Sequence, residues 1–217
     1  MIIFGLPPAV SAPQDPCDTM PATQMHVMCT TVTPSPDGRW KLVVAGDDDG
    51  RGAAKLRNLR LPQNPELRGA LVDVRTGRII YKFEMERSAW VHWLPGGQIL
   101  IVNYFQGSGT TMPLVFQLKQ GPVKEPIDLS ALVFPDVLKR IHHRRNQVYH
   151  YYVNYVSDED RDIVISAEPQ FVLKGDEGPG DGRCYLYRVD KATFSHYRFI
   201  KEVPEDNCPS HPEEHWS

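Results

Sequence analysis

A serine between two glycines, Ser108, is one residue whose setting could support nucleophilic catalysis. A nucleophile elbow needs glycine two residues before and two residues after the serine, on a turn from a strand into a helix. Gln106 and Thr110 occupy those two positions, so the elbow pattern is absent. Gly107 and Gly109 instead favour a glycine-rich hairpin loop around the serine.

Two histidines near the end of the chain have the spacing of a zinc motif. His211 and His215 lie four residues apart, but a zincin requires glutamate directly after the first histidine, on a long helix. Pro212 occupies that position, and the surrounding sequence is typical of a solvated tail. The four cysteines also lack the C-x-x-C spacing of zinc sites. We expect neither a metal nor a cofactor.

One block of the chain is rich in basic side chains. A nucleic-acid-binding protein would combine such a block with a basic overall charge and an aromatic binding motif. The net charge is −3, and no such motif is present, so we expect no nucleic-acid partner. The block is interpreted as a solvated helix end, where cations interact favourably with the helix dipole. It comprises Lys139, Arg140, His142, His143, Arg144 and Arg145.

Two loops, 46–52 and 175–182, combine aspartate with glycine. Neither has the alternating ligands and closing glutamate of an EF-hand, so solvated turns are one interpretation. The other is partner binding, because loops on a rigid scaffold often carry function and negative charge steers association with a basic cleft. On that hypothesis, the contacts are Asp47, Asp48, Asp49, Asp176 and Asp181.

Four tyrosines lie close together in an expected strand at 148–156. Alternation places Tyr149, Tyr151 and Tyr155 on one face, where we expect them in the core. Tyr152 points to the other face and is the surface candidate for contact with a partner.

The cysteines are even in number and lie near the two ends of the chain. In an oxidising compartment such as a bacterial periplasm they would form disulfides. Three pairings are possible in principle. We expect local pairing, Cys17 with Cys29 and Cys184 with Cys208, because each bridge would fix a terminus that otherwise frays.

Residues 1–12 are apolar and end in Val10-Ser11-Ala12, a pattern typical of signal-peptidase cleavage. They are interpreted as a signal-peptide remnant, which predicts a periplasmic or secreted protein. No run of about 18 apolar residues occurs, so no integral membrane association is expected. The remainder is predicted to form a single β-rich domain at 13–208 and a flexible tail at 209–217.

The expected elements are almost all strands. Residues 78–87 alternate apolar and charged side chains, Pro95-Gly96-Gly97 makes a turn, and 98–105 is rich in β-branched and aromatic residues. A short helix is expected within 129–143, with Pro135 in its first turn. Further strands are expected at 24–33, 40–45, 67–74, 114–118, 148–156, 162–165, 170–173, 184–189 and 194–203.

Turn sequences recur along the chain. Residues 35–39 (Ser-Pro-Asp-Gly-Arg) and 94–98 (Leu-Pro-Gly-Gly-Gln) each precede an apolar strand, and 157–161 is a looser third copy. Residues 72–77 and 189–193 both begin with Val-Asp and contain a threonine. A turn, a buried strand and a closing hairpin therefore repeat, which indicates a repeated supersecondary unit.

This repeat resembles the blades of a TolB-type or WD40-like β-propeller, over 33–104 and 156–199. The resemblance implies antiparallel hairpins in a blade-like arrangement. A closed propeller has about 4–8 blades, so three units would leave it incomplete. A β-sandwich needs the same turns and is the alternative. The predicted fold class is all-β and antiparallel, with one short helix.

With no assembled catalytic site, the predicted function is not enzymatic. The prediction is an exported protein that binds another protein, within that class an immunity or inhibitor protein that neutralises a secreted toxic enzyme in the bacterial envelope. The alternative is an envelope enzyme or small-ligand-binding protein whose site is assembled from dispersed residues, for example Asp73, His92 and His150.

Overall fold

The computed structural model describes residues 24–25, 31–44, 69–83, 89–106, 110–118, 125–141, 148–171 and 182–209. Strands dominate these ranges, and they contain one α-helix and one short 3-10 helix, so the all-β prediction is confirmed. In chain order the elements are β1 (Gln24–Met25), β2 (Thr31–Pro34), β3 (Trp40–Val44), β4 (Gly69–Asp73), β5 (Ile79–Phe83), β6 (Ala89–Trp93), β7 (Ile99–Gln106), β8 (Thr110–Gln117), β9 (Ile127–Asp128), α3 (Leu129–Arg140), β10 (Val148–Asp158), β11 (Asp162–Phe171), β12 (Arg183–Asp190), β13 (Tyr197–Pro204) and η2 (Glu205–Asn207).

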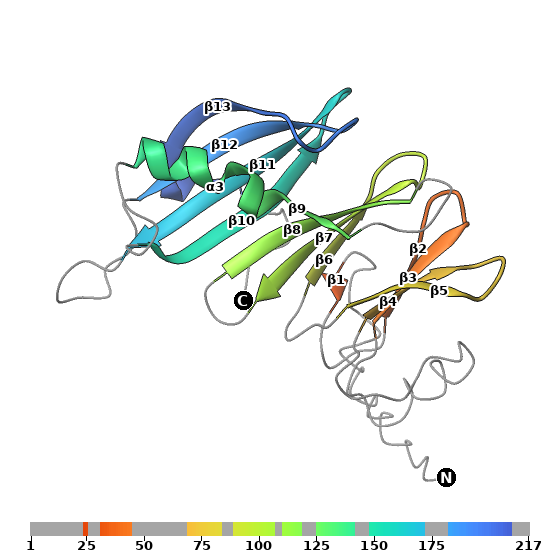
Figure 1. Ribbon diagram of the computed structural model, residues 1–217. Helices are drawn as coiled ribbons and strands as arrows, with labels where there is room; N and C mark the ends of the chain where they lie inside the picture. The colour runs from red at the N-terminus through yellow and green to blue at the C-terminus, as the bar shows by residue number, and fades with distance from the viewer. Residues whose placement is uncertain are drawn as a thin grey trace, which may run out of the picture.

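The strands form two sheets (Figure 1). A four-stranded sheet has the order β2-β3-β4-β5, and a nine-stranded sheet has the order β1-β6-β7-β8-β10-β11-β12-β13, with β9 beside β8. All pairings are antiparallel except that of β8 with β10, which is parallel and covers only Thr110 and Thr111 opposite Tyr151 and Tyr152. This short junction divides the large sheet into two parts.

Three units of consecutive antiparallel strands follow one another: a first unit (β2–β5), a second unit (β6–β8) and a third unit (β10–β13). In each, the first hairpin turn is closed by a backbone hydrogen bond from the residue after the first strand. The three bonds are Ser35 N–H to the Trp40 carbonyl (2.9 Å), Leu94 N–H to Ile99 (3.0 Å) and Glu159 N–H to Asp162 (2.8 Å). These turns are the recurring sequences, so the repeat corresponds to a repeated hairpin.

A second bond also recurs in all three units. The residue that follows the third strand donates its N–H to the carbonyl of the residue just before the second strand. The pairs are Val74 to Arg39 (2.9 Å), Leu118 to Gln98 (2.7 Å) and Lys191 to Arg161 (3.0 Å). Neighbouring turns at one end of each unit are therefore tied together by the backbone.

The closing turns of the first and third units also match. Gly77 donates to the Asp73 carbonyl (2.8 Å) and Phe194 donates to the Asp190 carbonyl (2.8 Å). Both residues have left-handed backbone, with φ of 67° and 50°. Glycine adopts this conformation without steric cost, whereas burial of the Phe194 ring, which is 1% exposed, offsets the strain in the third unit.

The helix α3 covers one face of the third unit (Figure 1). Asp128 caps its N-terminus by accepting hydrogen bonds from the N–H groups of Ser130 (2.8 Å) and Ala131 (3.2 Å). The buried helix side chains, spaced three to four residues apart, form an apolar stripe. They pack on β10, β11 and β12 in one core that includes Leu129, Val133, Val137, Ile141, Tyr151, Val153, Ile163, Ile165 and Tyr187.

A second core lies between the two sheets. It joins one face of the four-stranded sheet to β6, β7 and β8, so the first two units pack face to face. The second and third units instead share backbone hydrogen bonds in a single sheet. The inter-sheet core contains Trp40, Leu42, Val44, Leu71, Ala89, Val91, Leu100, Val102, Phe116 and Leu118.

Several local predictions were wrong. The single strand expected at 24–33 is divided between β1 in the nine-stranded sheet and β2 in the four-stranded sheet. Pro135 lies in the interior of α3, which begins at Leu129, rather than in its first turn. Residues 162–165 and 170–171 of the two expected strands belong to one strand, β11, and residues 172–173 lie outside the described residues. Pro169 is tolerated there because β12 pairs with β11 only as far as Ala167, so beyond that point one side of β11 has no β12 partner.

No helix in the described ranges is long and apolar enough to cross a membrane.

Candidate functional site

The strand β10 separates core tyrosines from a surface tyrosine. Tyr151 and Tyr155 are buried on the face covered by α3, as the alternation predicts. Tyr152 is part-exposed on the opposite face, as the same alternation predicts. The side chain of Tyr149 is not among those described.

Around Tyr152 four polar side chains of β10 and β11 form what we call the Tyr152 cluster: His150, Tyr152, Glu168 and Gln170. The antiparallel register places Tyr152 opposite Glu168 and His150 opposite Gln170. His150 Nδ1 and Tyr152 Oη are 2.9 Å apart, and Gln170 Nε2 donates to Glu168 Oε1 at 3.4 Å. All four side chains are part-exposed, so the cluster combines hydrogen-bonding groups with access from solvent.

The electrostatics of the cluster keep the tyrosine neutral. Partial burial, followed by the nearby Glu168 carboxylate, raises the pKa of Tyr152 above its usual value. The phenol therefore keeps its proton at physiological pH and acts as a hydrogen-bonding group with an apolar ring. This arrangement suits recognition by hydrogen bonds and ring contact.

Next to this cluster, buried polar groups hold the junction of β8 and β10. Asn103 Nδ2 donates to Asn154 Oδ1 at 2.8 Å, and Thr111 Oγ1 lies 3.2 Å from both Asn154 Oδ1 and the Val153 carbonyl oxygen. Asn103 and Thr111 are each 1% exposed. Because Thr111 pairs with Tyr152 in the parallel register, these bonds fix the backbone that carries the cluster.

Another polar group fastens α3 to the sheet. Asp136 Oδ2 accepts hydrogen bonds from Arg140 Nε (2.6 Å) and Tyr187 Oη (3.1 Å). The Arg140 guanidinium also lies over the Phe199 ring, 3.4 Å from its centroid. Burial, followed by the Asp136 carboxylate, raises the pKa of Tyr187. Lys139 and Arg140 lie in the last turn of α3, as the helix-end interpretation predicts, whereas His142, His143, Arg144 and Arg145 of the basic block lie outside the described residues.

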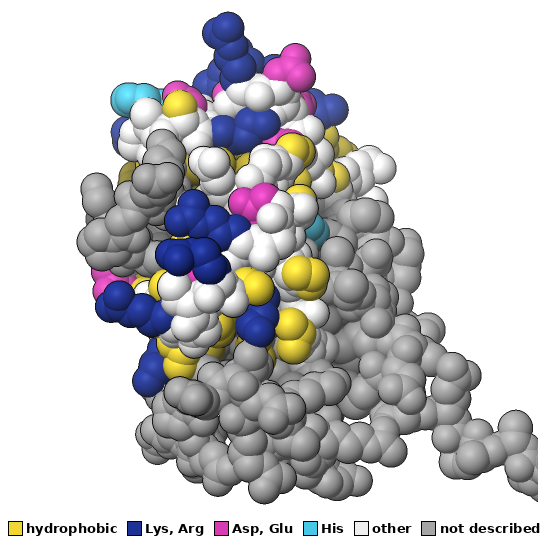
Figure 2. Space-filling view, turned by 90° about the vertical axis from the view of Figure 1, so that its right-hand side faces the viewer, with side chains coloured by type: hydrophobic (Ala, Val, Ile, Leu, Met, Phe, Trp, Pro, Cys, Tyr) yellow, Lys and Arg dark blue, Asp and Glu magenta, His cyan; other side chains and the backbone are white. Residues whose placement is uncertain are grey.

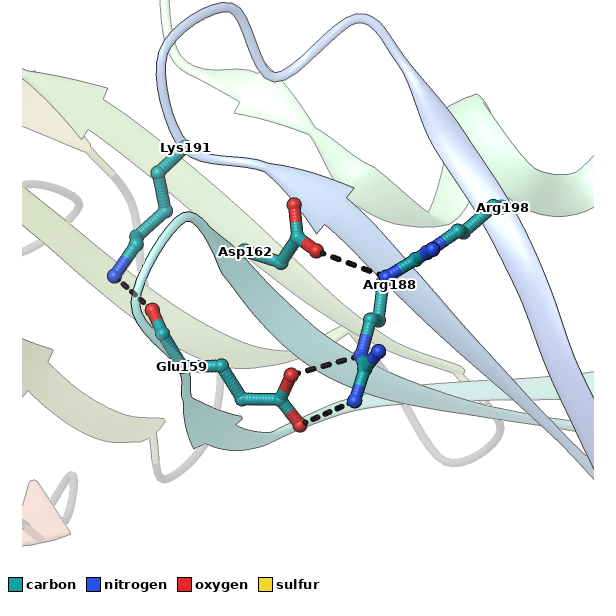
Figure 3. A network of polar contacts seen from close by, with 5 residues as sticks. All are labelled: Glu159, Asp162, Arg188, Lys191 and Arg198. Carbon is teal, nitrogen blue, oxygen red and sulfur yellow. Dashed lines mark hydrogen bonds and ion pairs between the residues drawn. The ribbon is translucent and has the colours of Figure 1, made fainter.

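In the third unit, ion pairs connect the two neighbouring turns (Figure 3). Arg188 Nη2 donates to Glu159 Oε1 at 3.2 Å, and Arg188 Nε lies 2.7 Å from Glu159 Oε2 in the same ion pair. Lys191 Nζ lies 2.6 Å from Asp158 Oδ1 and also donates to the Glu159 carbonyl. Arg198 and Asp162 form a longer pair at 3.6 Å, which completes the group. These charges are paired with each other at the end of the unit.

One of the two expected disulfides lies within the described residues. Cys184 and Cys208 are bonded, as predicted, and link the start of β12 to the segment after η2. The N–H of Glu205 also donates to the Gly182 carbonyl (2.7 Å), so the bridge and a backbone bond close the same hairpin end. A disulfide is typical of an oxidising, exported compartment.

The alternative function, an enzyme or small-ligand-binding protein, would use Asp73, His92 and His150, and these three residues have different neighbours in the structure. The Asp73 carboxylate accepts the Thr76 N–H (2.9 Å) in the β4–β5 turn. The ring of His92, on β6, lies 4.5 Å from that of Tyr155. Of the three, only His150 belongs to the Tyr152 cluster. In the described ranges, no group of three or more His, Cys, Asp and Glu side chains could hold a metal ion.

Most of the other candidate residues lie outside the described residues. They are Asp47, Asp48, Asp49, Asp176 and Asp181 of the two acidic loops, Cys17 and Cys29, and Ser108, His211 and His215. The sequence did identify Tyr152 but not its neighbours Glu168 and Gln170. The pairing register of β10 and β11 places both residues beside Tyr152. The alternation of the polar residues Ser166, Glu168 and Gln170 was the available sequence signal for this face.

No protein-family model matches the chain, and no curated protein matches it. The geometry of the Tyr152 cluster is therefore the basis for assigning a function.

Proposed function

We propose that this is an exported, non-enzymatic protein that binds another protein through the Tyr152 cluster. The observation that supports this most is the position of Tyr152, part-exposed on a sheet with its hydroxyl 2.9 Å from His150 Nδ1. Tyrosine is enriched among residues that dominate binding energy. A ring already held by a neighbour loses less conformational entropy when a partner covers it.

Within this class we propose an immunity or inhibitor protein that neutralises a secreted toxic enzyme in the bacterial envelope. The Cys184–Cys208 disulfide supports an exported protein. An inhibitor commonly covers an active-site cleft with loops on a rigid scaffold. The carboxylates of Asp47, Asp48, Asp49, Asp176 and Asp181 would then steer the chain toward a basic cleft and make the association rate fall with salt.

The experiment is a pull-down from an envelope extract with the tagged chain, followed by mass spectrometry and titration of the captured protein. Tyr152→Ala should weaken binding by about 2 kcal/mol, roughly 30-fold, as truncation of a central tyrosine does. Tyr197→Ala is the matched control, because Tyr197 is an exposed tyrosine (36%) elsewhere on the same sheet. Equal affinity of the wild type and Tyr152→Ala would contradict the proposed site.

The alternative is binding of a small polar ligand. It has one observation in its favour: the cluster brings an imidazole, a phenol, a carboxylate and an amide together on one face. Native mass spectrometry of the purified protein distinguishes the two. A bound small molecule that is lost in Tyr152→Ala would favour the ligand-binding function over a protein partner.

A further inference from the structure

The strand β13 forms one end of the nine-stranded sheet (Figure 1). It pairs with β12 on one side, and no strand in the described ranges pairs with its other side. None of its residues is buried. Tyr197 (36% exposed) and Ile200 (38% exposed) are two of the few large hydrophobic residues that are exposed in the described part of the chain. The outer side of β13 is therefore accessible to a partner.

A hydrogen bond at the start of β13 shows which of its backbone groups face outward. The Asp190 N–H donates to the His196 carbonyl (3.0 Å), so these opposite residues form a hydrogen-bonded pair. Bonded and non-bonded pairs alternate along an antiparallel ladder. Arg198 is therefore the next residue bonded to β12, and the N–H and C=O groups of Tyr197 and Phe199 point away from β12.

The second half of β13 carries the features that usually prevent pairing at a sheet edge. The register places a β-bulge at Ile200, and Lys201 and Pro204 follow it. Bulges, lysine and proline all disfavour the addition of another strand. Residues 197–199 contain none of these features. A strand added to this edge is therefore expected to be short and centred on Arg198.

The two faces of residues 197–199 differ in chemistry. Phe199 packs against the core beneath α3, and the Tyr197 ring centroid lies 5.8 Å from that of the core residue Tyr187. Arg198 points to the opposite face, because successive side chains of a strand alternate. An added strand would therefore meet aromatic rings on one face and a guanidinium on the other.

The Arg198 guanidinium favours a carboxylate on the added strand. The Arg198 side chain is 66% exposed, and its ion pair with Asp162 is long, at 3.6 Å. In the register Arg198 lies opposite Arg188, and like charges in this position repel. Charged side chains of both signs gather at the top of Figure 2, where the third unit lies. A carboxylate directly opposite Arg198 would give it a closer partner.

A second copy of the chain does not supply this carboxylate. The acidic residue of β13 is Glu202, which already forms an ion pair with Arg183. Glu202 lies opposite Tyr185, a core residue beneath α3, so Glu202 points to the face away from Arg198. Opposite residues of an antiparallel pair share a face. Glu202 of a second copy would therefore lie on the wrong face to contact Arg198.

We propose that residues 197–199 are a second interaction site, which accepts a short extended protein segment by antiparallel strand addition. The segment carries one carboxylate between two apolar side chains. Main-chain hydrogen bonds to Tyr197 and Phe199 supply affinity in this mode, and side-chain contacts supply specificity. The carboxylate lies opposite Arg198, and the apolar side chains contact the two rings. The site is separate from the Tyr152 cluster, because β11 and β12 lie between β10 and β13.

The test titrates synthetic peptides into the isotope-labelled full chain and follows its backbone amide signals by NMR. The capped peptide Gly-Ile-Asp-Ile-Gly should move the amide signals of residues 197–199. Methylation of both isoleucine nitrogens removes the donors that would face β13, and it should lower the affinity about tenfold. Methylation of the aspartate nitrogen is the matched control and should leave the affinity unchanged, because that N–H points away from β13 in an antiparallel pair.

The role of the charge is tested with protein variants. Arg198→Glu should lower the affinity for the aspartate peptide about tenfold and raise the affinity for Gly-Ile-Lys-Ile-Gly. Arg75→Glu makes the same change in net charge at an exposed arginine of the other sheet, so it should bind the aspartate peptide like the wild type. Tyr152→Ala should also bind it like the wild type.

Three results would overturn the proposal. The first is that no peptide moves the signals of residues 197–199 at millimolar concentration. The second is equal weakening by methylation of the isoleucine and aspartate nitrogens, because backbone pairing would then not be the binding mode. The third is movement of the same signals with protein concentration alone, because the occupant would then be a second copy of the chain.

Discussion

The first and third units have the same backbone arrangement but use their charges in opposite ways. At the turn end of the third unit, Glu159 and Asp162 face Arg188 and Arg198, and the charges pair with one another (Figure 3). At the corresponding end of the first unit, Arg39, Arg75 and Arg78 have no ion-pair partner in the described ranges. The same turn hydrogen bonds thus occur beside an ion-pair network in the third unit and, within the described residues, beside arginines that form no ion pair in the first unit.

This difference shows that the backbone hydrogen bonds at the turns determine the fold of each unit but not the charges of its side chains. The recurring bonds, such as Val74 to Arg39 and Lys191 to Arg161, use backbone atoms and do not depend on side-chain charge. Side chains at the turn ends can therefore change without changing the fold. In this chain the third unit pairs these charges with one another, whereas in the first unit Arg39 lies over the Trp40 ring.

The largest effects are expected from the two cores. Leu42, in the first unit, and Ile165, in the third, are both 0% exposed. Leu42→Ala and Ile165→Ala should each cost about 2–5 kcal/mol. If the units share one cooperative structure, calorimetry should show a single transition that both changes lower. Two transitions, each moved by only one variant, would show that the units unfold independently.

Removing the disulfide should affect the third unit specifically. The joint change Cys184→Ser and Cys208→Ser opens a loop with a sequence separation of 24. Loop-closure entropy predicts a loss of about 3.5 kcal/mol, measured by urea denaturation. Hydrogen exchange should rise in β12 and β13 and stay constant in β3 and β4. An unchanged midpoint would mean that the bridge does not constrain the unfolded chain.

The polar junction between β8 and β10 should have an intermediate effect. Asn154→Ala leaves the buried Asn103 amide without its 2.8 Å acceptor, which should cost about 1–3 kcal/mol. Asn207→Ala is the control, because Asn207 is exposed in η2. A difference of less than about 0.5 kcal/mol between the two variants, the range of surface changes, would show that these bonds do not hold the junction.

The smallest effect tests the charge comparison itself. Arg188→Gln breaks the two-point contact with Glu159, and because both side chains are about one-third exposed, the cost should be only about 0.5–1 kcal/mol and should shrink in high salt. Arg78→Gln, in the first unit, should leave the free energy of unfolding unchanged. If Arg78→Gln destabilises the protein as much as Arg188→Gln, the charges of the two units do not differ in their structural role.

The predictable features were those set by nearby residues. The turns at 35–39 and 94–98 have local chemistry, and alternation alone assigned Tyr151 and Tyr152 to opposite faces. The Cys184–Cys208 bridge follows from a hairpin that brings its ends together. Each of these depends on residues that are close in sequence or joined by a single turn.

The features that the sequence did not predict depend on contacts distant in sequence. No turn sequence predicts the parallel pairing of β8 with β10. This pairing places Asn103 in hydrogen-bond contact with Asn154. The place of Pro135 inside α3 and the continuity of β11 through Pro169 also depend on neighbouring elements. Local preference disfavours both prolines, but tertiary packing and the end of the β12 pairing permit them.

The most direct test of the proposed function is hydrogen–deuterium exchange of the tagged protein with and without the captured envelope protein. If the Tyr152 cluster is the binding site, amide exchange should slow at 150–154 and 166–170, and the slowing should be lost with Tyr152→Ala but kept with Tyr197→Ala. Unchanged exchange in both segments, in a complex that stays intact, would contradict the assignment of partner binding to this face.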